Sequence, residues 1–182
     1  MPVGNKKEIY TELNRQGKQV VMPKYLLSVA NCAYMGNTHI TKMRLNNFHI
    51  VGEHAFEGCC NLYSVTFSDS LLKIGMGAFK HCKKLTDLNL PDSVVKIEDY
   101  AFVGCSIKSM ILPKNLQTLG SKVFCGCRAL ESVVFPDKIK EITLSQKLFE
   151  NCDSLSQIEL CADCKIENGS IPENCRAIYR TT

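Results

Sequence analysis

The 182-residue sequence contains no tryptophan and no run of 18 consecutive apolar residues. A transmembrane helix needs about 20 predominantly apolar residues, so the missing run predicts that the chain does not insert into a membrane. Residues 1–8 also lack the apolar segment of a secretory signal peptide. The sequence therefore fits an intracellular protein, or a secreted or cell-surface protein whose signal was removed, and the compartment stays open.

The chain also lacks a strong excess of charge, since its formal net charge is +4. Its basic runs are only pairs, Lys6-Lys7 and Lys83-Lys84, without interleaved aromatic residues. Nucleic-acid-binding proteins usually carry a denser basic stretch. The hydrophobic fraction of 45% and the charged fraction of 22% are ordinary for a soluble globular protein. We therefore expect no nucleic-acid partner.

What the sequence does contain is a repeat of 22 to 25 residues, most clearly in residues 85–105 and 130–152. Two anchors keep the same register along the chain. The first is an aromatic residue after a small or apolar one, at Tyr34, Phe56, Phe79, Phe102, Phe124 and Phe149. The second is the last position of a predicted strand, at Met22, Leu45, Phe67, Leu90, Leu112, Phe135 and Leu160. The spacing changes in two places, because one residue is missing after Cys105 and two are added between Ile142 and Phe149. Self-similarity at this period is typical of a solenoid.

Each repeat has a simple physical interpretation. Alternating apolar residues, as in residues 85–90, predict a strand with every second side chain directed inward. A proline then ends the strand, because it has no N–H for the ladder. These prolines are Pro23, Pro91, Pro113 and Pro136. The following Val-x-x-Ile segment supplies a second inward contact. The Ala-Phe-x-Gly-Cys segment puts an aromatic ring under the strand, and its glycine permits a positive φ.

The pattern Leu-x-x-Leu-x-Leu-Pro, Val-x-x-Ile, Ala-Phe-x-Gly-Cys resembles the BspA-type leucine-rich repeat over about residues 17–166. The commoner leucine-rich repeat differs, because it has an asparagine after Leu-x-Leu and often an outer helix. The resemblance implies a right-handed, strand-rich α/β leucine-rich-repeat solenoid of about seven turns, with a parallel sheet on one face. In that family such solenoids serve as binding and adhesion surfaces, often on secreted or cell-surface proteins.

The two ends of the chain differ from the repeats. Ile9 and Leu13 lie at helical spacing and Asn5 is a suitable N-cap, so residues 5–16 predict a short capping helix. At the other end Ile178-Tyr179 predicts a last strand. We therefore divide the chain into an N-terminal cap (1–16), the solenoid (17–160) and a degenerate C-terminal repeat or cap (161–182).

Five of the eleven cysteines share one repeat position: Cys59, Cys82, Cys105, Cys127 and Cys152. Stacked turns lie about 4.8 Å apart, which a disulfide allows, but side chains in one column project in parallel. We therefore favour a column of buried thiols. Cys60 and Cys125 leave the column and are expected to be exposed. Cys161, Cys164 and Cys175 would suit zinc or a redox pair but lack a fourth ligand, so packing in the cap is favoured. The redox state of these last five cysteines stays open.

Catalysis finds little support in the sequence, which has no phosphate-binding glycine loop, nucleophile elbow or metal-binding helix motif. The main enzymatic alternative is a cysteine nucleophile with a histidine base. His81 is adjacent to Cys82, but the repeat turns Cys82 inward. His54 has no carboxylate at a set distance in the sequence. We therefore predict a non-catalytic protein with no catalytic residue, no resident metal and no cofactor.

The strand alternation also predicts which side chains are displayed. One row on the strand face is Gln19, Lys42, Ser64, Asp87, Ser109, Ser132 and Gln157. The other row is Val21, Arg44, Thr66, Asn89, Ile111, Val134 and Glu159. In the centre, apolar Ile111 and Val134 are flanked by serines, as in the middle of a binding patch. The alternative is that β-branched residues simply suit exposed strands.

We therefore predict that the residues of these two rows from Lys42 to Glu159 bind a partner protein, for which a host or cell-surface protein is a candidate. The module itself is expected to be a monomer. The alternative from another class is a structural or adhesive segment of a cell-surface protein with no single dedicated partner. A further row would suit an acidic partner or a glycan, but we interpret it as solvated charge. This row is His49, Lys73, Lys96, Thr118, Glu141 and Lys165.

Overall fold

The structure is a computed structural model, and it describes residues 19–21, 27–136, 143–144, 147–161, 165–166, 170–173 and 175–180. The predicted capping helix over residues 5–16 lies outside these ranges, as does Cys164. Side chains are described for all of these residues except 19–21, 143–144, 161 and 165–166. Within the described ranges every regular element is a strand.

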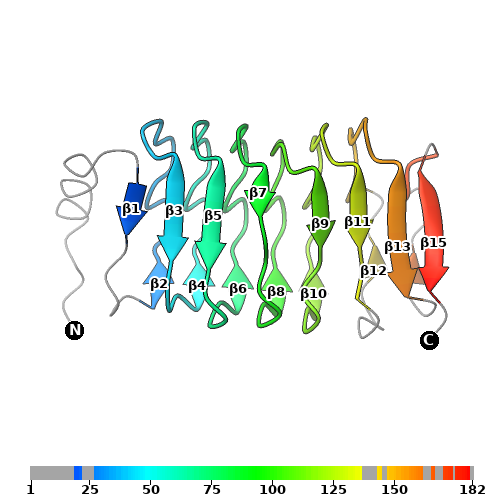
Figure 1. The fold of residues 1–182 in the computed structure, drawn as a ribbon, viewed down its shortest axis with the longest axis horizontal. Helices are drawn as coiled ribbons and strands as arrows, with labels where there is room; N and C mark the ends of the chain where they lie inside the picture. Colours follow the sequence, from blue (N-terminus) through cyan, green and yellow to red (C-terminus); the bar gives the residue numbers. More distant parts are fainter. Residues whose placement is uncertain are drawn as a thin grey trace.

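The chain winds as a parallel β-solenoid, in which each turn contributes one strand to a front face and a two-residue strand to a back face (Figure 1). The front strands are β1 (Gln19–Val21), β3 (Lys42–Leu45), β5 (Ser64–Phe67), β7 (Asp87–Leu88), β9 (Ser109–Ile111), β11 (Ser132–Val134), β13 (Gln157–Cys161) and β15 (Arg176–Arg180). The back strands are β2 (Ser28–Val29), β4 (Ile50–Val51), β6 (Lys73–Ile74), β8 (Lys96–Ile97), β10 (Thr118–Leu119), β12 (Thr143–Leu144) and β14 (Lys165–Ile166).

Every strand pair is parallel and joins equivalent residues of neighbouring turns, as the repeat predicts. The front strands form two four-stranded sheets, in the orders β1-β3-β5-β7 and β15-β13-β11-β9. The back strands form a five-stranded sheet, β10-β8-β6-β4-β2, and the pair β12-β14. The last strand, β15, pairs with β13 over residues 176–180. This confirms the prediction of a strand at Ile178-Tyr179.

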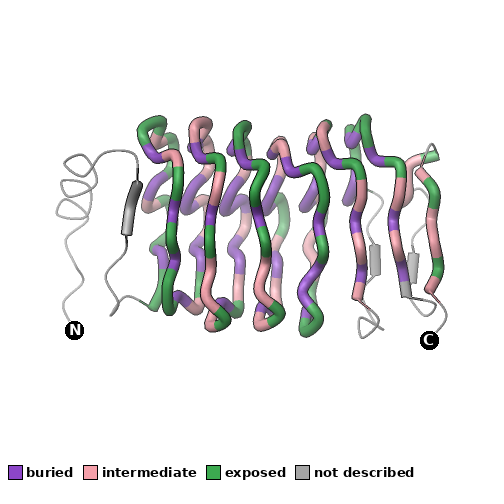
Figure 2. The backbone as a smooth tube through the Cα atoms, viewed as in Figure 1, coloured by how far each residue is buried: buried purple, intermediate pink, exposed green. Residues whose placement is uncertain are grey.

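The core is a set of columns, each filled by one repeat position, and it runs through the interior of the solenoid (Figure 2). The predicted aromatic residues stack face to face, with ring centroids 5.1 Å apart for Tyr34 and Phe56 and 5.2 Å apart for Phe56 and Phe79. The five cysteines of the predicted column are buried and free. Because one turn covers the apolar faces of its neighbours, stability comes from stacking the repeats.

The turn after each aromatic residue requires a positive φ, as the glycine pattern predicts. Glycine meets this requirement in four repeats, at Gly36, Gly58, Gly104 and Gly126. In the other two, His81 (φ 60°) and Asn151 (φ 59°) occupy the same position. A side chain at positive φ costs about 1–2 kcal/mol. The repeat geometry therefore overrides the local preference of these two residues.

Candidate functional site

The strand register aligns the two predicted rows on the front face. Lys42 pairs with Ser64 and Ser64 with Asp87, while Arg44 pairs with Thr66. In the second sheet Ile111 pairs with Val134 and Val134 with Glu159, and the adjacent row joins Ser109, Ser132 and Gln157. Gln19 and Val21 align with the start of the two rows through β1. Asn89 follows the end of β7 and is exposed. The front face thus brings all of these positions onto one surface.

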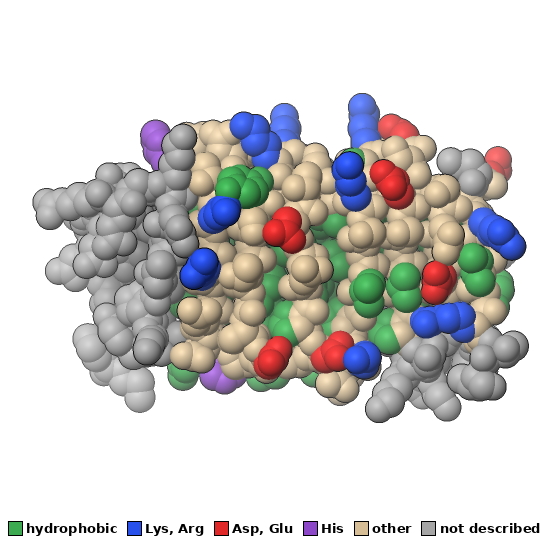
Figure 3. All heavy atoms as spheres, in the orientation of Figure 1, with side chains coloured by type: hydrophobic (Ala, Val, Ile, Leu, Met, Phe, Trp, Pro, Cys, Tyr) green, Lys and Arg blue, Asp and Glu red, His purple; other side chains and the backbone are tan. Residues whose placement is uncertain are grey.

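Ile111 is the most exposed of the large hydrophobic side chains in the described residues, at 71% of its full accessible area. Val134, beside it on β11, is half-buried, and Ser109 and Ser132 flank the pair. Figure 3 shows hydrophobic side chains next to each other in the C-terminal half of this face. Burying the apolar surface of such a side chain against a partner contributes about 25 cal/mol per Å² to the free energy of binding. This pair is therefore the apolar centre of the candidate site.

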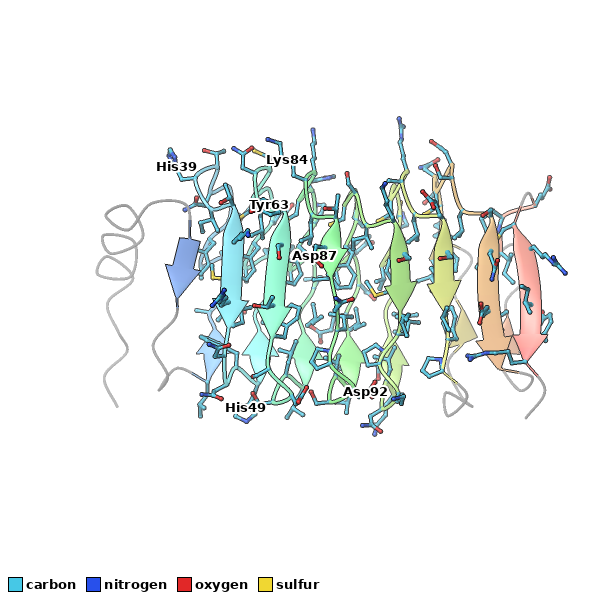
Figure 4. All side chains as sticks on the ribbon, in the orientation of Figure 1. His39, His49, Tyr63, Lys84, Asp87 and Asp92 are labelled. Carbon is cyan, nitrogen blue, oxygen red and sulfur yellow. The ribbon has the colours of Figure 1, made fainter. Side chains whose placement is uncertain are left out.

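The N-terminal half of the face is basic. Lys42 and Arg44 are exposed, and within the described part of the chain neither forms an ion pair. The ammonium of Lys42 lies 5.2 Å from the ring centroid of Tyr63, a cation–π contact. Tyr63 is 40% exposed and projects from the same side as Asp87 (Figure 4). Sequence reasoning missed Tyr63, because it precedes the strand and so falls outside the two rows.

The acidic side chains of the face have partners. The hydroxyl of Ser64 donates to Asp87 at 3.2 Å. Glu159 accepts a hydrogen bond from the Gln157 amide at 3.0 Å and lies 3.8 Å from the guanidinium of Arg180. The register also extends the rows to Arg176 and Ile178 on β15. Sequence reasoning named this strand but did not place these residues on the face, although the alternation of residues 176–180 contains the signal.

Two lysines of the row along the back strands form ion pairs. Lys73 and Lys96 both lie 2.9 Å from the same carboxylate oxygen of Glu98. Partial burial acts to raise the pKa of Glu98, but the hydrogen bonds from Lys96 and Lys73 lower it more, so the pKa lies below its usual 4.5. His49 lies at the lower edge (Figure 4), Thr118 is exposed, and Glu141 and Lys165 have no described side chain. The paired lysines support the interpretation as solvated charge.

One sequence expectation about histidine is wrong. The Nδ1 atom of His54 lies 2.6 Å from a carboxylate oxygen of Glu57, three residues further along the chain. The ammonium of Lys80 lies 3.0 Å from the other oxygen of that carboxylate. Partial burial acts to raise the pKa of Glu57, but Lys80 and His54 lower it more, so the pKa is below 4.5. The turn that places His54 at positive φ brings the two groups together, which sequence spacing alone did not show. No described cysteine is hydrogen-bonded to this histidine.

The other cysteine–histidine pair does not form a nucleophile and base. His81 is exposed, whereas Cys82 is buried and donates its S–H to the carbonyl of Phe56 at 3.1 Å. Burial raises the pKa of Cys82 far above its usual 9.0, so the reactive thiolate is suppressed. The described residues also contain no group of three or more His, Cys, Asp and Glu arranged to hold a metal ion. Nor do they include a helix with the length and apolar character needed to span a membrane.

The family model of the BspA type leucine rich repeat region matches this chain in six copies, over residues 10–85 and 49–179. Several solved structures are similar. A leucine-rich repeat protein of T. pallidum is 29% identical with a TM-score of 0.75, and the match covers 90% of this chain and 73% of that protein. A leucine-rich repeat protein of Bacteroides ovatus is 26% identical with a TM-score of 0.71.

The match to the Bacteroides ovatus protein covers 92% of this chain but only 48% of that one. The pneumococcal vaccine antigen PcpA is 23% identical with a TM-score of 0.60. The match covers 90% of this chain and 36% of that protein. This last likeness concerns the fold alone. A search of curated protein sequences gives no match. The structural comparisons therefore agree on a repeat solenoid, and two of these solved proteins are much longer than the matched region.

Proposed function

The chain belongs to the BspA-type leucine-rich-repeat family, and we propose that it is a non-catalytic protein-recognition module whose partner binds the front strand face. The observation that carries this proposal is the display of Ile111, which is 71% exposed on a paired strand beside Val134. An apolar centre surrounded by small polar side chains matches the composition of protein interfaces. The repeat fixes its core columns and leaves this face free to vary.

The proposed binding residues form a strip along the solenoid axis. They are Lys42, Arg44, Ser64, Thr66, Asp87, Asn89, Ser109, Ile111, Ser132, Val134, Gln157 and Glu159. The apolar pair supplies the desolvated contact and the surrounding polar side chains supply orientation. The proposed partner is a protein, because the candidate residues are spread along a strip of strands, whereas small-molecule sites are concave pockets.

The test is a double charge substitution, Ile111→Asp with Val134→Asp, in the intact chain. Partners are captured from the native source and the binding curve of each is measured against wild type. We expect the double variant to lose saturable binding while its far-UV circular dichroism is unchanged, because both side chains point away from the core. Unchanged binding by the folded variant would sink the proposal.

Ile50→Asp provides a matched control. Ile50 is also a strand isoleucine and is 40% exposed, but it lies on β4 of the back sheet. Under the proposal its substitution leaves partner binding intact. The alternative role, a structural or adhesive segment without a dedicated partner, predicts no saturable binding by wild type at all. The same measurement therefore separates the two functions.

A further inference from the structure

The front strands do not form one continuous sheet, because β7 and β9 are not paired. The pairing is already incomplete one strand earlier, where only Ser64 and Val65 of the four-residue β5 pair with β7. Pairing resumes at β9, which joins β11 over all of residues 109–111. We call this interruption the β7–β9 joint. It divides the candidate site between Asn89 and Ile111.

The cause is the one-residue deletion in the repeat. In the two neighbouring turns a main-chain hydrogen bond closes the segment before the strand, from the amide of Leu85 to Cys82 at 2.9 Å and from Leu130 to Cys127 at 3.0 Å. Ile107 occupies the equivalent position but comes only two residues after Cys105. The main-chain hydrogen bond between residues three apart therefore cannot form in this turn, so the chain enters β9 from a different position.

The other two sides of the solenoid stay closed at the joint. On the back face Lys96 and Ile97 of β8 pair with β10. On the aromatic side the amide of Phe79 donates to Ala101 at 2.9 Å. The ring stack is continuous across the joint, since the centroid spacing is 5.8 Å for Phe79 and Phe102 and 5.9 Å for Phe102 and Phe124. The interruption is therefore confined to the ladder itself, because both of its ends are bridged: the Ser106 hydroxyl donates to the Lys83 carbonyl at 2.6 Å, and the Asn115 amide donates to the Asp92 carbonyl at 2.9 Å.

The joint leaves main-chain groups open in the middle of the face. The amide of Leu112 donates to Val134 at 3.0 Å, so it is directed toward β11. Successive residues of a strand direct their amides to opposite sides, and the amides of Ser109 and Ile111 are therefore directed toward β7. Since β9 does not pair with β7, these amides have no ladder partner there.

The chemistry of the face changes at the same joint. On the β1–β7 block the exposed described side chains of the two rows are polar or charged, including Lys42 and Arg44, which form no ion pair with any described residue. On the β9–β15 block the second row carries Ile111, Val134 and Ile178, with Glu159 between the last two. The structural boundary and the chemical boundary coincide, although nothing in the repeat requires them to do so.

We infer that the front face is two contact surfaces, a basic one on β1–β7 and an apolar one on β9–β15, which meet at the interrupted ladder of the β7–β9 joint. The partner that this arrangement fits is a protein with an acidic site and an apolar site. Arg44 and Ile111 are three turns apart in one row, so the two sites lie roughly 14 Å apart at about 4.8 Å per turn. The partner chemistry rests on the function proposed above, whereas the interrupted ladder does not.

Amide hydrogen exchange by NMR in deuterated water tests the interrupted ladder without any ligand. In wild type the amide of Ile111 is expected to exchange at least about 100-fold faster than that of Val134, its neighbour in the same row, because only Val134 has a ladder partner. Inserting one asparagine between Cys105 and Ser106 restores the repeat length and should bring the two rates within about tenfold. Equal protection of Ile111 and Val134 in wild type would overturn the interrupted ladder and the division of the face there, whether or not the insertion variant folds.

A phage-displayed library of random peptides, selected on the intact chain, tests the partner chemistry. Selected peptides are expected to combine acidic and apolar residues and to lose binding to the Lys42→Glu/Arg44→Glu variant. Peptides that lack acidic residues, or that bind this variant as well as wild type, would overturn the basic contact surface and leave the proposed function standing. Peptides that bind the Ile111→Asp/Val134→Asp variant as tightly as wild type would overturn the proposed function itself.

Discussion

The sulfur of Cys82 lies 3.1 Å from the carbonyl oxygen of Phe56, to which it donates its S–H. The same bond joins Cys59 to Tyr34 at 3.0 Å and Cys105 to Phe79 at 3.1 Å. Cys127 and Cys152 continue the ladder. Each thiol therefore adds a second hydrogen bond to a buried carbonyl of an earlier turn; the Phe56 carbonyl, for example, also accepts the main-chain amide of Cys59 at 3.1 Å. The cysteine column is a structural device of the repeat.

The first prediction concerns thiol accessibility. The column thiols are buried, whereas Cys32 is exposed and Cys60, Cys125 and Cys175 are half-buried. Native protein treated with Ellman's reagent under non-reducing conditions should therefore show only a few fast-reacting thiols. After denaturation nearly all of the eleven should react, because none of the column is expected to form disulfides. A low count in the denatured protein would contradict the free-thiol column.

The second prediction is a loss of stability at alkaline pH. Burial raises the pKa of Cys59 and of Cys152 from the usual 9.0 to about 12. Above pH 9 the unfolded chain releases thiol protons that the native state retains, so unfolding becomes more favourable as pH rises toward 12. Each such thiol lowers the free energy of unfolding by up to about 1.4 kcal/mol per pH unit. Urea denaturation at several pH values, with reductant present, measures the slope.

Cys82→Ser is the control for this slope. A serine hydroxyl can donate to the Phe56 carbonyl but does not ionise in this pH range. The variant should therefore lose less stability between pH 8 and pH 10 than wild type does, whatever its stability at pH 7. If the two proteins show the same pH dependence, Cys82 does not contribute through its ionisation.

The third prediction concerns Glu98, which pairs with Lys73 and Lys96. Its pKa is lowered in the folded state, so its contribution is present above the unfolded pKa and disappears as pH falls. Glu98→Gln should cost no more than about 1 kcal/mol at pH 7, because the lysines are partly solvated. The difference in stability between the variant and wild type should shrink in urea titrations as pH falls below 4.5 and through the lowered pKa of Glu98. A larger deficit of the variant at low pH would show a role other than the ion pairs.

The repeat, the strand positions and the buried columns could be predicted because each depends on a local pattern that recurs. What sequence reasoning missed depends on contacts between turns. The cation–π contact of Tyr63 with Lys42 joins neighbouring turns, and the β7–β9 joint follows from how a three-residue segment fails to close. The missing residue after Cys105 was visible, but its effect on pairing three positions later was not. The contact between His54 and Glu57 depends on the positive φ of His54, which the residue types in this turn do not predict.

The fourth prediction tests the turn where His81 stands in place of glycine. A Cβ added to Gly104 (φ +66°) would lie 2.8 Å from Nδ1 of His81, whereas one added to Gly126 (φ +70°) would meet only the main chain of Gly104, at 3.7 Å and beyond. Both Gly→Ala changes cost about 1–2 kcal/mol for the positive φ. Gly104→Ala should cost about 0.5–1.5 kcal/mol more, because the exposed His81 ring must leave its preferred rotamer.

The extra cost should vanish when the ring is removed. In a His81→Gly background, Gly104→Ala and Gly126→Ala should destabilise the protein equally in urea titrations, since only the φ penalty remains. His81→Gly alone relieves one positive-φ side chain but adds chain entropy to the unfolded state, so its own effect is expected to be within about 1 kcal/mol of zero. If Gly104→Ala still costs more than Gly126→Ala without the ring, the extra cost comes from the backbone of the turn. The His81 side chain then does not cause the difference, although it occupies a position where most repeats have glycine.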